Sequence, residues 1–203
     1  MLPLVSIITP CYNAASFISQ AIESVLAQSF GDWEMIIVDD CSSLDSDDIW
    51  LPNKLSDQLK VFEKSEVAIV FSNYEKVSLG GERCGREVIA PCEVDYPLLL
   101  KGNCIGCLTA MYDSALTGKI FFKEIGHEDY VCWLSILKQG YKAQNTNTVT
   151  ALYRVSDHSV SSNKLKAMRW QWNILRNEMD LPVYKAVYYF IHYAIRAFAK
   201  AMR

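Results

Sequence analysis

The sequence lacks a long apolar run and a strong charge of either sign. Polar or charged side chains interrupt every apolar stretch before the roughly 20 residues that a membrane-spanning helix needs, so we expect no such helix. The net charge of −3 and the pI near 5.6 give no reason to expect a nucleic-acid partner. The opening Met1-Leu2-Pro3 does not resemble a signal peptide, and we therefore expect a cytoplasmic protein.

The sequence also lacks a regular cysteine framework. Its seven cysteines are an odd number at irregular spacings, which favours reduced thiols. Cys104 and Cys107 form a lone C-x-x-C pair, and without a second pair neither a zinc site nor a redox site is expected. With 203 residues, 51% of them apolar, the chain can bury a sizeable core. We expect one domain over residues 1–160 and a C-terminal helical extension over residues 161–203.

The first forty residues have the pattern of one strand–helix–strand unit. The apolar runs at Leu4–Ile8 and Trp33–Val38 predict buried strands, and residues 14–29 between them carry apolar side chains at helical spacing. Such a unit has parallel strands, and ligands of open α/β sheets bind beyond the carboxyl ends of the strands. The turn Thr9–Asn13 and the pair Asp39-Asp40 should therefore border one pocket.

Five aspartates follow closely after the second strand, at positions 39, 40, 45, 47 and 48. Carboxylates this close repel one another unless a cation or hydrogen-bond donors compensate their charge. A hard divalent cation held with a phosphorylated substrate is one interpretation, because such ions prefer oxygen ligands. A solvated acidic surface loop is the other.

The rest of the chain alternates helices and strands, which predicts the α/β class. Apolar runs predict strands at Val67–Phe71, Leu108–Tyr112 and Val149–Val155, and helical spacing predicts helices at residues 53–64, 128–138 and 164–178. The final stretch, Val183–Arg203, is apolar except for a stripe of basic residues, Lys185, His192, Arg196, Lys200 and Arg203. A helix of this kind must bury most of its surface, either in a membrane interface facing anionic head groups or against protein. Both interpretations are open.

Four segments of the sequence together resemble the family-2 glycosyltransferases. They are PLVSIITPCYNAASFISQAIESVLAQSFGDWEMIIVDDCS, LDSDDIWLPNKLSDQL, GHEDYVCWLSILKQGYKA and LYRVSDHSVSSNKLKAMRWQWNILR. The resemblance implies a GT-A fold, a Rossmann-like mixed sheet flanked by helices. It also implies inverting transfer of a sugar from a nucleotide-diphosphate sugar, expected to be a UDP-sugar, to a glycan or lipid-linked acceptor. The last segment is similar to bacterial enzymes that build surface polysaccharide or lipopolysaccharide. Peripheral contact of residues 183–203 with the inner face of the cytoplasmic membrane is one of the two interpretations of the final helix.

The resemblance assigns roles to the acidic residues. Asp45 and Asp47 would be the D-x-D motif that holds a divalent metal, Mn²⁺ or Mg²⁺, with Asp47 as the direct ligand. The metal would stabilise the charge of the departing nucleoside diphosphate. Asp129 would be the general base that takes the proton of the acceptor hydroxyl, supported by Glu128. The other interpretation of Glu128 and Asp129 is that they only stabilise the start of their helix.

The resemblance also assigns the nucleotide side of the site. Pro10 and Tyr12 would lie beside the base, with Asp39 and Asp40 near the base or ribose. Arg154 would approach the diphosphate, because a guanidinium suits phosphate oxygens. Tyr12 could instead be an ordinary packing residue.

One departure from the family pattern is large. Family members have about fifty residues between the V-D-D end of the second strand and the D-x-D motif, whereas only Cys41-Ser42-Ser43 separate Asp40 from Leu44 here. About two strands and a helix are therefore missing. The loss would expose backbone hydrogen-bonding groups in the core. We expect either that strand 67–71 pairs with the first strand to give a smaller sheet, or that the chain is an impaired remnant of its family.

Overall fold

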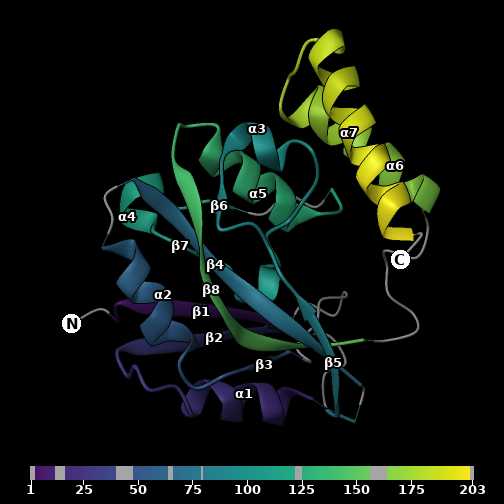
Figure 1. The fold of residues 1–203 in the computed structure, drawn as a ribbon. Helices are drawn as coiled ribbons and strands as arrows, with labels where there is room; N and C mark the ends of the chain where they lie inside the picture. The colour runs from purple at the N-terminus through teal and green to yellow at the C-terminus, as the bar shows by residue number, and fades with distance from the viewer. Residues whose placement is uncertain are drawn as a thin grey trace.

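The computed structural model describes residues 3–11, 17–39, 48–63, 66–78, 80–121, 125–155 and 164–201. It has two sheets with helices packed around them and a pair of C-terminal helices at one side of the molecule (Figure 1). No helix in these ranges is both long enough and apolar enough to cross a membrane.

The smaller sheet is the expected strand–helix–strand unit. Strands β1 (Val5–Cys11) and β2 (Trp33–Asp39) pair in parallel, and α1 (Ile18–Leu26) connects them. Alternating side chains of β1, Val5 and Ile7, are buried with Val25 and with Leu55. The pairing confirms the sequence prediction, although β1 extends three residues beyond it, through Pro10 to Cys11.

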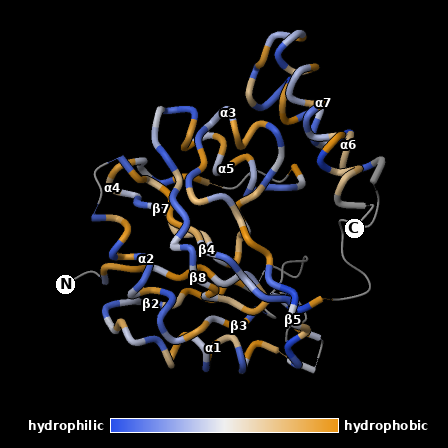
Figure 2. Tube along the Cα trace, viewed as in Figure 1, coloured by the Kyte–Doolittle hydropathy of each residue, from blue (hydrophilic) through white to orange (hydrophobic). Residues whose placement is uncertain are grey.

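The larger sheet is mixed, with strand order β3-β8-β4-β5. Its long central strands, β4 (Val67–Val77) and β8 (Lys142–Arg154), are parallel to each other. The shorter strands pair antiparallel with them: β3 (Ile49–Trp50), β5 (Arg83–Val88), β6 (Glu93–Val94) and β7 (Met111–Tyr112). The first half of β4, Val67–Phe71, is apolar, whereas its second half and most of β8 are polar (Figure 2).

Helices cover this larger sheet and complete the main core. They are α2 (Lys54–Phe62), α3 (Tyr96–Leu99), η1 (Cys107–Thr109), α4 (Ser114–Thr117) and α5 (Glu128–Leu137). Residues Val131, Leu134, Ile136 and Leu137 of α5 are all buried, as its sequence pattern predicted. The predicted strand Leu108–Tyr112 is wrong over its first half, because Leu108 and Thr109 belong to the 3₁₀ turn η1.

The expected rearrangement around the missing segment does not occur in the described residues. Strand β4 pairs with β5, β7 and β8, and β1 pairs with β2. Strand 67–71 has therefore not moved in beside the first strand. The small sheet is less buried than the sequence predicted for its two strands, with Ile8 60% exposed and Ile36, Ile37 and Val38 of β2 between 42% and 46% exposed. Two strands alone bury little apolar area, which explains this exposure.

The C-terminal extension is helical, as predicted. It comprises α6 (Lys164–Asn173), the π-helical turn η3 (Ile174–Glu178) and α7 (Val183–Ala201). Ile174, Leu175, Met179 and Ala186 from this extension belong to the main core cluster, so the extension is packed onto the domain. Most of the described side chains of α7 are exposed in the single chain, so the domain covers only one side of this helix. Burial of the rest in a membrane interface or against another protein stays a prediction.

Candidate active site

The carboxyl ends of β1 and β2 lie side by side. Cys11 is opposite Asp39 and Pro10 is opposite Val38 in the parallel register. Two of the predicted nucleotide-side residues, Pro10 and Asp39, therefore border the same edge, as the sequence indicated. Tyr12 and Asp40, which follow them directly, lie outside the described residues, as does the side chain of Asp39.

Arg154 reaches this part of the molecule from the larger sheet. It is the last residue of β8 and is only 3% exposed. Its guanidinium donates a hydrogen bond to Oε1 of Gln20 and lies 5.1 Å from the ring centre of Phe17. Both partners are at the start of α1. The structure thus brings the predicted diphosphate arginine to the start of this helix.

The predicted metal ligands, Asp45 and Asp47, lie outside the described residues. The segment that contains them joins the end of β2 to β3, and β3 pairs with β8 so that Ile49 is opposite Leu152, two residues before Arg154. The segment therefore begins at the nucleotide edge and ends beside the strand that carries Arg154. The described residues hold no group of three or more metal-binding side chains. The carboxylates of the segment are the oxygen donors that Mg²⁺ and Mn²⁺ prefer, so its donor set fits such an ion.

Asp129 lies in the first turn of α5, where its carboxylate is oriented by two hydrogen bonds. Nδ2 of Asn103 donates to Oδ2 of Asp129 at 3.0 Å, and the backbone N–H of Tyr130 is the second donor. Burial raises the pKa of the Asp129 carboxyl above its ordinary value, and the Tyr130 and Asn103 hydrogen bonds lower it by less. A carboxylate with a raised pKa is a better proton acceptor, which suits a general base.

Glu128 holds the turn that precedes α5. Its Oε1 accepts a hydrogen bond from the backbone N–H of Gly126 at 3.1 Å. Gly126 and His127 both have positive φ, at 73° and 58°, and the His127 ring packs edge-to-face on Trp170 of α6 at 4.8 Å. A Cβ at Gly126 would approach Trp170 to 2.8 Å, so only glycine fits. Glu128 thus holds the turn directly before α5 in place, and its supporting role for Asp129 stays a prediction.

Asn103 is a site residue that the sequence did not indicate. Its amide orients Asp129, while its Oδ1 accepts a hydrogen bond from the backbone N–H of Ile105 at 3.0 Å. Gly102 before it has φ 129°, and a Cβ there would come within 3.2 Å of the Tyr193 ring of α7. The dipeptide Gly102-Asn103 marked only a break between elements in the sequence. The contact with Asp129 spans 26 residues, which a local pattern cannot reveal.

The described side-chain contacts form two separate groups. One joins Arg154 to the start of α1. The other joins Asn103 to Asp129, Gly126 to Glu128, and His127 to Trp170 of α6. An arginine beside the β1–β2 unit, a carboxylate-rich segment and an oriented carboxylate with raised pKa are features that a nucleotide-sugar transferase would use. This is the class that the sequence resemblance implies.

Comparisons with known proteins agree with this class. The model of "Glycosyl transferase family 2" matches residues 6–44. The putative teichuronic acid biosynthesis glycosyltransferase TuaG of Bacillus subtilis (strain 168) is 34% identical over 98% of this chain and 98% of its own length. The Escherichia coli protein named UDP-Glc:alpha-D-GlcNAc-diphosphoundecaprenol beta-1,3-glucosyltransferase WfgD is 33% identical over 95% of this chain and 92% of its own length. The chain belongs to glycosyltransferase family 2.

Solved structures show the same fold. The crystal structure of S. aureus TarS 1-349 with UDP-GlcNAc superposes with a TM-score of 0.67 at 17% identity, covering 96% of this chain and 72% of the 1-349 chain. The mannosyltransferase PcManGT from Pyrobaculum calidifontis, in complex with GDP-Man and Mn²⁺, superposes with a TM-score of 0.60 at 13% identity, over 100% and 76% of the two chains. The fold is therefore GT-A, as the sequence resemblance implied.

The alignment with TuaG also bears on the missing segment. It spans 247 residues, whereas this chain has 203, so at least 44 aligned positions stand opposite a gap in this chain. The family match ends at residue 44, next to the junction that the sequence marked near Ser43. Both observations support an internal loss after the second strand.

Proposed function

We propose that the protein transfers a sugar, with inversion and with a divalent metal, from a UDP-sugar to a glycan or lipid-linked acceptor in bacterial surface-polysaccharide biosynthesis. The observation that carries the proposal is the Asp129 carboxylate, which is oriented by Asn103 and has a raised pKa. The names of TuaG and WfgD support the polysaccharide and lipid-linked acceptor, and UDP-GlcNAc in TarS supports the donor class.

In this proposal the β1–β2 edge binds the nucleotide. Pro10 and Tyr12 pack beside the base, while Asp39 and Asp40 accept hydrogen bonds from the base or ribose. Arg154 lies close to the diphosphate and offsets its negative charge. Its contacts with Gln20 and Phe17 hold the guanidinium against the helix that follows the nucleotide turn.

Asp45 and Asp47 would hold the divalent ion, with Asp47 as the direct ligand. When bound, the ion stabilises the negative charge of the departing nucleoside diphosphate. The Mn²⁺ in PcManGT supports this assignment, as does the oxygen-rich donor set of the segment.

Asp129 would accept the proton of the attacking acceptor hydroxyl. The acceptor oxygen forms a bond to the anomeric carbon as the bond from that carbon to the diphosphate oxygen breaks, and the hydroxyl proton passes to the Asp129 carboxylate. A single displacement of this kind inverts the anomeric configuration. The Asn103 amide keeps one carboxylate oxygen in place, and Glu128 keeps the turn in place.

The test measures UDP release from a panel of UDP-sugars with Mn²⁺ and a diphosphate-linked polyprenyl acceptor. We expect turnover by the native chain and a loss of roughly 10²–10⁴-fold in Asp129→Asn. Asp180→Asn is the matched control, because Asp180 is exposed and has φ 54°, a conformation that asparagine also adopts. Equal turnover in Asp129→Asn and Asp180→Asn would reject Asp129 as the base.

A second candidate function, a family member with strongly reduced turnover, is favoured by the uncovered β2 residues Ile36, Ile37 and Val38. The lost segment would have supplied neighbours for the small sheet and the strand before the metal ligands. The test compares the native chain with one in which the corresponding TuaG segment is inserted after Ser43. A higher rate in the restored chain supports the reduced-turnover function, and equal rates reject it.

A further inference from the structure

Helix α7 presents its most apolar side away from the protein. Its inner side packs on the domain through the buried Ala186 and the partly buried Tyr189, Phe190 and Tyr193. At about 100° per residue, the opposite side carries six large apolar or aromatic residues, here called the outer strip. They are between 40% and 71% exposed: Tyr184, Val187, Tyr188, Ile191, Ile195 and Phe198.

A basic edge runs along one side of the outer strip. It consists of Lys185, His192 and Arg196, which lie at neighbouring angles on the helix. The sequence has no Asp or Glu between residues 183 and 203. Two copies of α7 packed strip to strip would therefore bring basic residues together with no acid of α7 to pair with them. An anionic surface supplies the opposite charge.

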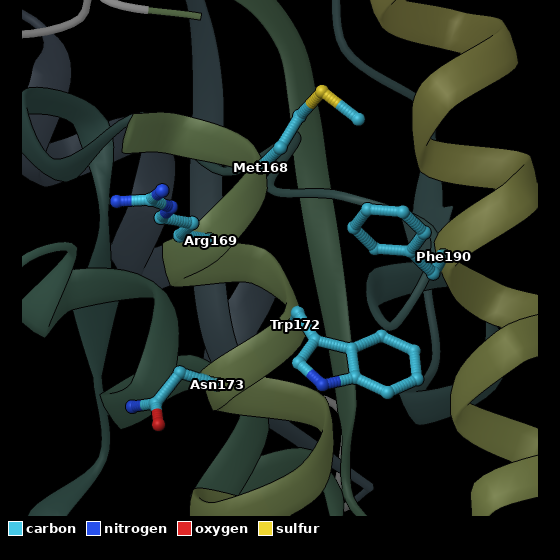
Figure 3. Close-up of a pocket in the computed structure, with 5 residues that line it drawn as sticks. All are labelled: Met168, Arg169, Trp172, Asn173 and Phe190. Atoms are coloured by element: carbon cyan, nitrogen blue, oxygen red, sulfur yellow. The ribbon is translucent and has the colours of Figure 1, made fainter. Parts of the chain in front are cut away.

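A groove between α6 and α7 continues this apolar surface. It has a volume of about 420 Å³ and is lined by Met168, Arg169, Trp172, Asn173 and Phe190. The rings of Trp172 and Phe190 meet edge-to-face across it, with 5.5 Å between their centres (Figure 3), and Trp172 is 37% exposed. Arg169 adds a cation on the α6 side.

We propose that the outer strip of α7 lies in the surface of an anionic lipid bilayer, with the basic edge at the level of the head groups. A helix parallel to the bilayer buries its apolar side at the boundary between head groups and acyl chains, while basic side chains contact lipid phosphates. The mixture of tyrosines with Ile, Val and Phe in the strip suits this boundary. The helix does not need the length or uniform apolarity of a spanning segment.

This orientation has a consequence for the candidate base. The inner side of α7 contacts Gly102 through Tyr193, and the next residue, Asn103, orients Asp129. A bilayer beneath the outer strip would therefore lie on the far side of a single helix from the segment that holds Asp129. Membrane docking itself does not rest on the proposed transfer, because it follows from the surface of α7 alone.

The experiment is co-sedimentation of the full chain with phosphatidylcholine vesicles, with and without phosphatidylglycerol, in the absence of any sugar donor. We expect binding to the mixed vesicles that weakens as salt increases. Ile191→Asp and Ile195→Asp should each lower the partition coefficient by roughly tenfold. Lys185→Gln and Arg196→Gln should each lower it by about fivefold, only on mixed vesicles. Ile89→Asp is the matched control, since Ile89 is 74% exposed and far from α7 in the sequence.

Circular dichroism and sedimentation equilibrium of the same proteins complete the test. Native-like spectra of the variants, which are expected for exposed positions, exclude unfolding as the cause of weaker binding. Binding by Ile191→Asp equal to that of Ile89→Asp would overturn the proposal. So would a native chain that binds neither vesicle, or one that forms a dimer which Ile191→Asp dissociates while vesicles have no effect.

Discussion

Lys54 is a fully buried lysine, and its charge makes a sharp prediction about stability. Its Nζ donates to Oε1 of Gln58 at 2.6 Å and lies 4.1 Å from the ring centre of Trp50, with no carboxylate among these partners. Desolvation lowers the pKa of Lys54 from 10.5 to about 7. The perturbation is Lys54→Met, which keeps much of the side-chain volume and removes the titrating group.

The direction and the size of the pH effect on stability follow from the pKa of Lys54 in the folded chain and in the unfolded chain. Because the folded pKa is below the unfolded one, the unfolded chain binds more protons between pH 7 and 10.5, and stability rises with pH in that window. The cost of the buried ammonium is about 4 kcal/mol at pH 7 and disappears above the unfolded pKa. Between pH 7 and 8.5 the native chain should gain about 1–2 kcal/mol relative to Lys54→Met.

The assay is urea unfolding of both proteins across this pH range, with the difference in unfolding free energy as the readout. Lys60→Met is the matched control on the same helix, since the Lys60 side chain is 71% exposed and pairs with Asp57, and it should show no such difference. If the stability of Lys54→Met has the same pH dependence as that of the native chain, the pKa of Lys54 is not lowered by its burial.

The remaining predictions concern the base, its turn and the small sheet. Asn103→Ala removes a hydrogen bond to the charged carboxylate, so the pKa of Asp129 should rise further and the acid limb of kcat/KM should move to higher pH; an unmoved limb contradicts the role of Asn103. Gly126→Ala should destabilise the fold by roughly 2 kcal/mol because a Cβ meets Trp170 at 2.8 Å. Gly31→Ala, with open space around it, should not destabilise it. Equal melting temperatures of the two variants would refute this prediction. Ile36→Thr should reduce light scattering on mild heating with little change in stability, since Ile36 is exposed. Val5→Thr, at a buried position, should destabilise the fold. Unchanged scattering in Ile36→Thr would count against the small sheet as the aggregating surface.

Patterns that depend on neighbours in sequence were predictable. The strand–helix–strand unit, the apolar run of β4 and the buried positions of α5 all follow from local periodicity. The predicted burial of the first strand was wrong, because β1 alternates and Ile8 is exposed. The edge shared by Pro10 and Asp39 was predictable too, because parallel strands end at the same side.

Features that depend on distant contacts were not predictable. Strand β4 pairs with β8 and not with β1, and this pairing joins residues 75 positions apart, such as Val67 and Lys142. The role of Asn103 depends on a contact across 26 residues. The outward direction of the α7 strip was also hidden, because the sequence shows that a helix has two unlike sides but not which side meets the domain.

The most direct test of the proposed donor site is the thermal midpoint of the purified chain with Mn²⁺ and UDP together. A ligand that binds only the folded state stabilises it by about 2.7 kcal/mol at 100 times its Kd. A donor site in this protein predicts a midpoint that rises only when both ligands are present. The rise should disappear in Asp47→Asn and persist in Asp129→Asn. An unchanged midpoint in the native chain would contradict a donor site in this protein.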